Sequence, residues 1–294
     1  MTDTCLPAAS VLALGGTIAS TGAGAGVTPT LSADELAESV PSLAQVAQIR
    51  ADTFRQVPSP ELTLSDLTAL AGEIERRIAG GDAGVVVTQG TNTIEETAFV
   101  LDLLVGGDAP VVVTGAMRNP TLPGADGPAN LLAAVSTAVS ADARGLGALV
   151  VFADEIHAAR YVRKAHTQSV MPFRSSPIGP IGWMSEGRVR VGARPAGRRH
   201  LELDPVGEPP RIALVTLGAG DEGLLVDAVA GAGYQGLVVE ATGGGHTTAA
   251  CADRVAALAN AMPVVLASRT GAGELLQSTY SRSQGPRSTS SAGA

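Results

Sequence analysis

The chain has 294 residues, of which 45% are apolar and 16% charged, and its net charge is −8. This length and apolar content allow a large core spread over about two domains, which excludes an intrinsically disordered protein. The acidic balance and the lack of a Lys/Arg block argue against a nucleic-acid partner. Cys5 and Cys251 are the only cysteines, so we expect neither a disulfide framework nor a cysteine-based metal site.

The first residues, MTDTCLPAASVLALGG, carry an acid and lack the basic segment of a secretory signal peptide. No apolar run approaches the ~20 residues that span a membrane. We therefore expect a cytoplasmic protein with no membrane partner.

Short apolar runs rich in Val and Leu recur along the chain, and each ends in glycine or a small polar residue. They cover residues 11–17, 84–91, 110–116, 146–154, 211–220, 236–245 and 263–273. Runs that are apolar without alternation are typical of strands buried on both faces of a parallel sheet.

Helical patterns separate these runs. Three begin with a hydroxyl residue followed three positions later by an acid, the spacing of a capping box: Ser32 and Glu35, Thr63 and Asp66, and Thr93 and Glu96. A fourth places Pro128 in its first turn, where a missing N–H is harmless. The alternation of strand and helix predicts an α/β fold with a mostly parallel sheet.

Residues 155–210 interrupt this alternation with many Pro, Gly and Arg residues, and we expect hairpins or an extended connection there. DPVGEPPR at 204–211 is typical of a linker. We therefore predict a larger N-terminal α/β domain over residues 1–205 and a smaller C-terminal α/β domain over 211–280. Residues 281–294 lack large apolar side chains, which predicts a disordered tail.

Ligands of open parallel sheets bind at the carboxyl ends of the strands. Gly16 and Thr17 follow the first predicted strand, and Thr91 and Asn92 follow the run at 84–91. For any one of these residues the alternative is a turn or a helix cap, and Asn caps helices as well as Asp does. Two Thr-Gly loops after separate buried strands nevertheless favour a functional site.

A hydroxyl nucleophile needs a base or a neighbouring lysine. Lysine is rare in this chain, and Lys164 lies in a polar, non-helical stretch. The alternative for Lys164 is a solvated surface charge. None of the four histidines occurs with a Gly-x-Ser-x-Gly motif, which disfavours a Ser-His-Asp hydrolase. The chain has no Walker loop or dinucleotide fingerprint, which disfavours an unrelated nucleotide-binding α/β protein.

Three long segments resemble the bacterial-type L-asparaginases, amidohydrolases with a threonine nucleophile. They are LALGGTIAS at 12–20, VVVTQGTNTIEETAFVLDLL at 85–104 and PVVVTGAMRNPTLPGADGPANLLAAV at 110–135. The resemblance extends from about Val11 to Ser278. It implies the same two-domain fold and a homo-oligomer, a dimer or a tetramer, with no metal or organic cofactor.

The resemblance also implies the chemistry. Thr17 would attack the side-chain amide of asparagine, or of glutamine, and form an acyl-enzyme that water hydrolyses. Thr91 and Lys164 would form a second catalytic pair. The substrate would be bound by Gly16, Ser59, Gly90, Asn92 and Ala116, with the backbone N–H groups near Gly90 and Ala116 as oxyanion donors.

Three departures from the family pattern lead us to expect reduced activity. Asn92 replaces an Asp whose carboxylate holds the substrate's α-ammonium, and residues 20–30 lack a Tyr near the nucleophile. The C-terminal domain is expected to be shortened. Our interpretation is an asparaginase-type amidohydrolase, and the alternative is a non-catalytic or weakly active amino-acid-binding relative.

Overall fold

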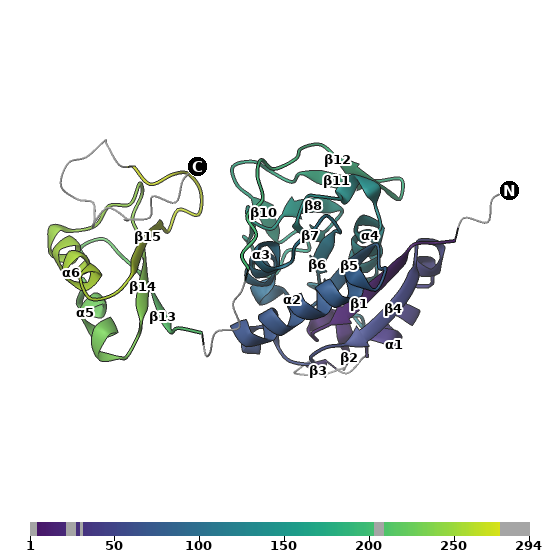
Figure 1. Cartoon of the computed structure of the whole chain (residues 1–294), viewed down its shortest axis with the longest axis horizontal. Helices are drawn as coiled ribbons and strands as arrows, with labels where there is room; N and C mark the ends of the chain where they lie inside the picture. Colours follow the sequence, from purple (N-terminus) through teal and green to yellow (C-terminus); the bar gives the residue numbers. More distant parts are fainter. Residues whose placement is uncertain (1–4, 22–27, 30–31, 203–208, 277–294) are drawn as a thin grey trace. The chain divides into compact units, whose positions relative to one another are not determined.

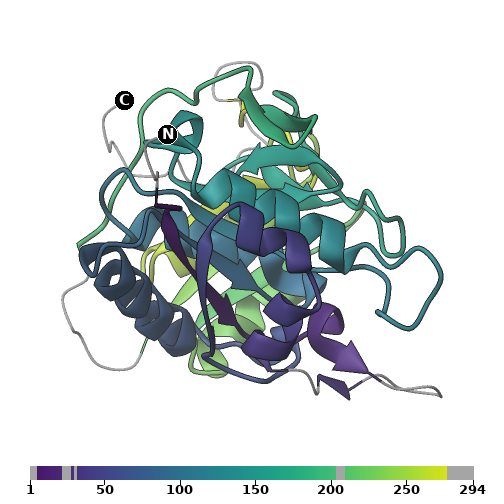
Figure 2. The ribbon, with the colours of Figure 1, turned by 90° about the vertical axis from the view of Figure 1, so that its right-hand side faces the viewer.

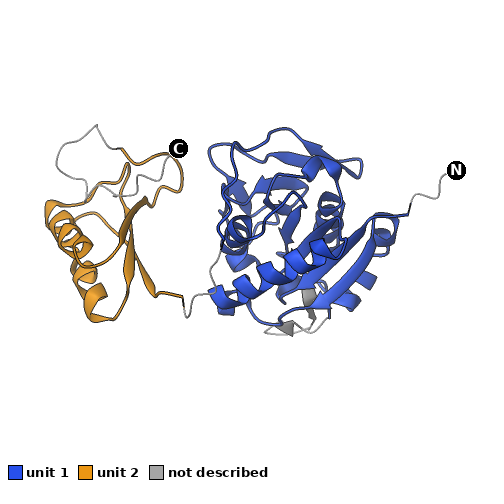
Figure 3. Cartoon of the chain, in the orientation of Figure 1, with its two compact units in different colours: residues 1–205 blue, residues 206–294 orange. Residues whose placement is uncertain are grey.

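The computed structural model describes residues 5–21, 28–29, 32–202 and 209–276. The chain forms two compact units, residues 1–205 and 206–294 (Figure 3). Both are α/β, and the larger carries a mostly parallel sheet, which confirms the predicted fold class. The expected tail at 281–294 lies outside the described residues. So does most of the segment 20–30, which contains no tyrosine.

The larger unit contains an eight-stranded sheet in the order β12-β11-β8-β7-β6-β5-β1-β4. Five strands are parallel: β1 (Ala8–Ala13), β4 (Gln48–Thr53), β5 (Gly84–Thr88), β6 (Val111–Thr114) and β7 (Ala148–Phe152). The other three are antiparallel: β8 (Glu155–Ala158), β11 (Gly182–Ser185) and β12 (Arg188–Val191). The hairpin β11–β12 confirms the prediction for the irregular middle of the chain.

The order of the parallel strands creates one break in the winding of the sheet. From β1 the chain forms β4 on one side and then places β5 on the other side of β1. The connections that leave β1 and β5 therefore diverge at the carboxyl ends of these two strands. Such a switch point is where doubly wound sheets bind their ligands.

Four helices cover the two faces of this sheet (Figures 1 and 2). α1 (Ala33–Glu38) and α4 (Gly127–Ala138) bury apolar side chains against one face. α2 (Leu64–Ala79) and α3 (Ile94–Leu104) cover the other. Strands that are covered on both faces need apolar residues at every position, and β5, β6 and β7 are buried throughout.

Short elements complete the larger unit. Two of them pair as a separate two-stranded sheet, β9 (Val162–Lys164) with β10 (Phe173–Ser175), and β2 (Ser20–Thr21) pairs with β3 (Thr28–Pro29). The described part of the unit also contains short 3-10 helices, η1 (Thr17–Ala19), η2 (Pro41–Gln45), η3 (Ser59–Glu61), η4 (Thr91–Thr93) and η5 (Ala141–Ala143).

The smaller unit has a parallel three-stranded sheet with its own core. The strands are β13 (Ile212–Thr216), β14 (Gly236–Ala241) and β15 (Val264–Ser268), and the helices are α5 (Leu224–Gly231) and α6 (Ala249–Ala259). No helix in the described part of either unit combines the length and the apolar character needed to cross a bilayer.

Two of the three predicted capping boxes are present, and the third is wrong. Ser32 and Thr63 each accept a hydrogen bond from the backbone three residues on, and Glu35 and Asp66 reciprocate. The Thr93 side chain makes no cap bond to α3. Its hydroxyl donates to Ser59 O over 3.0 Å instead, because η4 precedes α3 and turns this hydroxyl toward η3.

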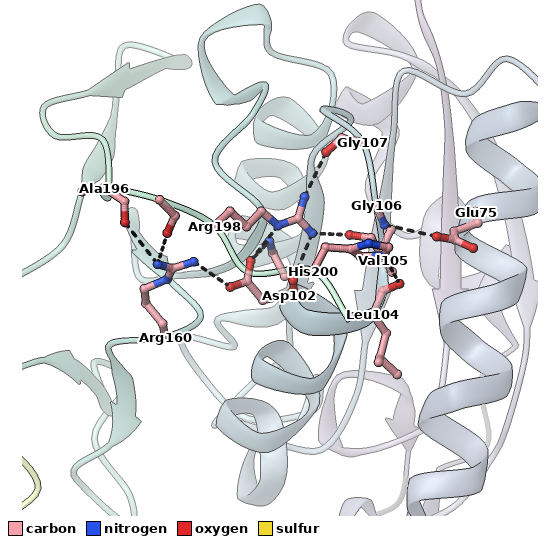
Figure 4. Close-up of polar contacts among 12 residues, drawn as sticks. Glu75, Asp102, Leu104, Val105, Gly106, Gly107, Arg160, Ala196, Arg198 and His200 are labelled. Atoms are coloured by element: carbon pink, nitrogen blue, oxygen red, sulfur yellow. Dashed lines mark hydrogen bonds and ion pairs between the residues drawn. The ribbon is translucent and has the colours of Figure 1, made fainter. Parts of the chain in front are cut away.

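A buried ionic network ties the last part of the larger unit to α3 (Figure 4). The Asp102 side chain is 5% exposed and lies 3.3 Å from Arg198 Nε and 3.4 Å from an Arg160 terminal nitrogen. It also accepts a bond from the Ala148 N–H, over 3.0 Å. Arg198 donates in turn to the carbonyls of Val105 and Gly107 near the end of α3. One carboxylate thus organises α3, β7 and the segment that leaves the unit.

We expect Asp102→Ala to lower the free energy of unfolding by about 3 kcal/mol, because it leaves two partly buried guanidinium groups without their counter-charge. Urea denaturation of the purified protein measures this loss. The exposed neighbour Asp108 provides the control, since Asp108→Ala should change stability by less than about 0.5 kcal/mol. Equal effects of the two substitutions would contradict the role of the network.

Candidate active site

Two turns meet at the switch point between β1 and β5. Gly16 has a φ of +90°, which favours glycine, and a Cβ atom at this position would lie 2.1 Å from the Gly90 nitrogen. The turn after β1 therefore packs backbone to backbone against the turn after β5. The two threonines that follow these glycines, Thr17 and Thr91, begin η1 and η4 in adjacent turns.

Ser59 closes a third side of the site. It begins η3 and is only 3% exposed. Its Oγ would lie 3.1 Å from a Cβ atom placed on Gly90. Its carbonyl accepts the bond from Thr93 that fixes η3 against η4. The Ser59 hydroxyl has no hydrogen-bond partner among the described residues. A buried hydroxyl without a partner is unfavourable unless a ligand or water satisfies it.

Lys164 is the only lysine in the sequence, and its ammonium group lies at the site. Nζ donates to Thr91 Oγ1 over 2.8 Å and to Asn92 Oδ1 over 3.1 Å. The residue is the last of β9, in the small sheet outside the main one. These contacts argue against the alternative that Lys164 is only a solvated surface charge.

The environment of Lys164 destabilises its charge. Partial burial lowers the pKa of the ammonium group from its usual range, and the nearby carboxylate of Glu95 opposes part of this shift. Thr91 and Asn92 contribute neutral oxygen atoms only. A lysine with a lowered pKa releases or shares a proton more readily than one in water, which suits it to activate the hydroxyl of Thr91.

Asn92 lies beside Thr91 and contacts Lys164. Its side chain is exposed, and the amide oxygen accepts the bond from Lys164. α3 begins two residues later, after the turn η4. The observed bond directs the Asn92 side chain to Lys164, which favours the site interpretation over a role as a simple helix cap.

The turn that contains Ala116 depends on two residues that the sequence analysis missed. Asp126 accepts bonds from the N–H groups of Met117 (2.9 Å) and Arg118 (2.8 Å). Asn130, only 2% exposed, donates to Gly115 O and accepts from Ala153 N–H, each over 3.0 Å. Together they hold the ends of β6 and β7 in place. A buried-facing Asn in the otherwise apolar helix GPANLLAAV was the available signal.

The turns that carry the predicted site residues thus contact one another at one edge of the sheet, and Lys164 reaches them from β9. Gly115, which precedes Ala116, approaches Thr91 closely enough that a Cβ atom there would lie 3.3 Å from Thr91 Cγ2. In the described part of the chain, no three His, Cys, Asp or Glu residues gather in a way that could hold a metal ion.

Comparison with known proteins shows which family the chain belongs to. Residues 9–197 match the family model described as Asparaginase, N-terminal, and residues 211–293 match the Glutaminase/Asparaginase C-terminal domain. The chain belongs to the asparaginase family. The match confirms the resemblance that the three sequence segments indicated.

Several members of the asparaginase family are similar to this chain over most of its length. L-asparaginase 2 of Bacillus subtilis is 34% identical over 91% of this chain and 74% of its own. Glutaminase-asparaginase of Pseudomonas fluorescens is 38% identical over 69% of this chain, and the match spans only 58% of that relative. The crystal structure of a probable cytoplasmic L-asparaginase from Campylobacter jejuni superposes with a TM-score of 0.86, at 31% identity, over 93% of this chain and 87% of that one.

We expect Gly16→Ala to destabilise the protein by at least about 2 kcal/mol, because the new methyl group would collide with the Gly90 backbone in a strained φ region. Thermal unfolding monitored by circular dichroism measures the change. Gly72 is the matched control: it lies inside α2, and no atom comes within 4 Å of the place that a Cβ atom would occupy there. Gly72→Ala should raise stability by about 0.5–1 kcal/mol, and a Gly16→Ala variant as stable as the parent would argue against the close contact.

Proposed function

We propose that the chain is an L-asparaginase that hydrolyses the side-chain amide of asparagine to aspartate and ammonia. The observation that carries the proposal is the bond of 2.8 Å between Lys164 Nζ and Thr91 Oγ1, beside the packed turns of Gly16 and Gly90. Membership in the asparaginase family supports the same reaction. Glutamine, one methylene longer, is a second candidate substrate.

Thr17 is the proposed nucleophile. It follows the Gly16 turn at the switch point and is half-buried, so its hydroxyl is accessible to a small substrate. Its Oγ would attack the amide carbon and form an ester, and the amide nitrogen would leave as ammonia after taking up a proton. Water would then attack the ester, release aspartate and restore the Thr17 hydroxyl.

Thr91 and Lys164 are proposed to move protons in these steps. Their hydrogen bond places an ammonium group, whose pKa is lowered by burial, against a hydroxyl. The lowered pKa favours the neutral amine, and in that form Lys164 can take up a proton from the attacking hydroxyl through Thr91 and return it to the leaving nitrogen. Arginine could not replace Lys164 in this role, because its guanidinium does not release a proton in proteins.

The remaining residues are proposed to bind the substrate. The buried Ser59 hydroxyl, which has no partner in the described part of the chain, can donate to the α-carboxylate. The N–H groups near Gly90 and Ala116 can stabilise the oxyanion that develops on the amide carbonyl. Asn92 can offer only a neutral oxygen to the α-ammonium, and this oxygen already accepts a bond from Lys164.

The neutral Asn92 is the observation that favours the second candidate, a weakly active or non-catalytic amino-acid-binding protein.

In either case we propose a homo-oligomer, a dimer or a tetramer. A cytoplasmic location is proposed as well, and the description of the Campylobacter relative supports it.

Thr17→Ala should abolish ammonia release from asparagine, to below about one-thousandth of the parent rate, because no other group would form the ester. The measurement is a coupled ammonia assay on purified protein. Thr17→Ser is the control, since it keeps a hydroxyl and should retain measurable turnover. Turnover of Thr17→Ala at the parent rate would refute the assignment of the nucleophile, and an inactive parent with intact asparagine binding would favour the second candidate.

Asn92→Asp should raise kcat/KM for asparagine at least tenfold, which corresponds to about 1.4 kcal/mol, because a carboxylate would pair with the substrate's α-ammonium, to which Asn92 offers only a neutral oxygen. Succinamic acid, which lacks the α-amino group, serves as the control substrate and should gain little. Equal gains on both substrates, or none on either, would contradict a role of position 92 in binding the ammonium group.

A further inference from the structure

The backbone of Lys164, like its side chain, makes a hydrogen bond to the segment that begins at Thr91. Glu95, in the first turn of α3, accepts a short hydrogen bond from the Lys164 N–H through Oε2. This contact joins two elements that are 69 positions apart in the chain. It is separate from the bonds that Nζ makes to Thr91 and Asn92. The segment from Thr91 to Glu95 therefore binds both the side chain and the backbone of Lys164.

The position of β9 outside the main sheet explains why the Lys164 backbone needs this hydrogen bond. Among the described residues β9 pairs with β10 alone, outside the eight-stranded sheet, so no ladder of the main sheet there fixes Lys164 relative to the switch point. A lysine side chain has four rotatable bonds, and Nζ finds Thr91 reproducibly only if its own backbone is held in place. The Glu95 carboxylate supplies that anchor from the element that follows Thr91.

We propose that Glu95 is a positioning residue of the amidase site, whose carboxylate fixes the Lys164 backbone so that Nζ meets Thr91. The inference rests on the proposed function and assigns to that site a residue that does not touch the substrate. Glu95 also supplies negative charge beside a cation that stands next to neutral Thr91 and Asn92. Its two contributions, an acceptor and a charge, can be separated by substitution.

The other charged groups around Lys164 do not replace Glu95. On α3, Glu96 is exposed, and on β9, Arg163 is exposed beside it. On β10, Arg174 donates to Phe173 O over 2.9 Å and lies 3.9 Å from Glu155. The electrostatic influence on the Lys164 pKa comes from Glu95, which raises it against the effect of burial.

The test compares Glu95→Gln, which keeps an acceptor oxygen but removes the charge, with Glu95→Ala, which removes both. Glu96→Gln is the matched control on the same turn. Asparagine turnover is measured against pH, and the Lys164 titration is followed by NMR with ¹³Cε-labelled lysine, for which the single lysine of the chain gives one side-chain signal. The NMR measurement does not depend on activity.

Glu95→Ala should lower kcat at least tenfold with a smaller change in KM, whereas Glu95→Gln should keep kcat within about threefold at its optimum. Both should move the Lys164 titration to lower pH, and Glu96→Gln should leave turnover and titration near the parent's. A purely structural role of Glu95 would lower the melting temperature without moving the titration. An unmoved titration in both variants, or parent-like kcat in Glu95→Ala, would overturn the proposal.

If the parent releases no ammonia from asparagine, the proposed function fails, and the titration alone decides the role of Glu95. A titration that shifts in Glu95→Gln and not in Glu96→Gln then supports the Glu95–Lys164 contact without any catalytic assumption.

Discussion

The close approach of Gly16 to Gly90 is the constraint on which the site depends. At 2.1 Å from the Gly90 nitrogen, the space for a Cβ atom at position 16 is already filled by another backbone. Only glycine permits this contact, and its positive φ directs the chain into η1 rather than onward along β1. Thr17 and Thr91 are neighbours because two glycines let two turns share that space. The apolar strands below determine where the turns start, and the glycines determine how near they come.

Lys164 is placed at the site by a different part of the structure. The threonines lie in turns that follow strands β1 and β5 of the main sheet, whereas the lysine is the last residue of β9 in a separate two-stranded sheet. β9 pairs with β10, and polar contacts with the first turn of α3 and with η4, rather than pairing with the main sheet, connect Lys164 to the site. The site thus combines a rigid part, built by the sheet, with a part placed by a few hydrogen bonds. Substitutions in the second part should affect the chemistry more than the stability of the fold.

The sequence predicted the strands β1, β5, β6, β7 and those of the smaller unit, because continuous Val and Leu runs have few other interpretations. It missed β4, whose sequence QIRADT is polar and exposed because this strand lies at the edge of the sheet. The capping box at Thr93 failed because a tertiary contact with Ser59 takes the hydroxyl. Thr17, Thr91 and Lys164 were found through the family resemblance and the turns that hold them. Asp126 and Asn130 were missed: an Asn in an apolar helix was a signal for Asn130, but no local pattern identifies the backbone groups of other turns that these two side chains bind.

The single lysine has a practical consequence for anyone who works with this protein. Reagents that couple polymers, dyes or solid supports to proteins commonly react with lysine amines, and here the only side-chain amine is the one bonded to Thr91. Its pKa is lowered by burial, which increases the fraction of the neutral, nucleophilic amine at a given pH. Conjugation through lysine would therefore modify the candidate active site itself. Cys5, an exposed thiol shortly before β1, offers a handle in a different part of the larger unit.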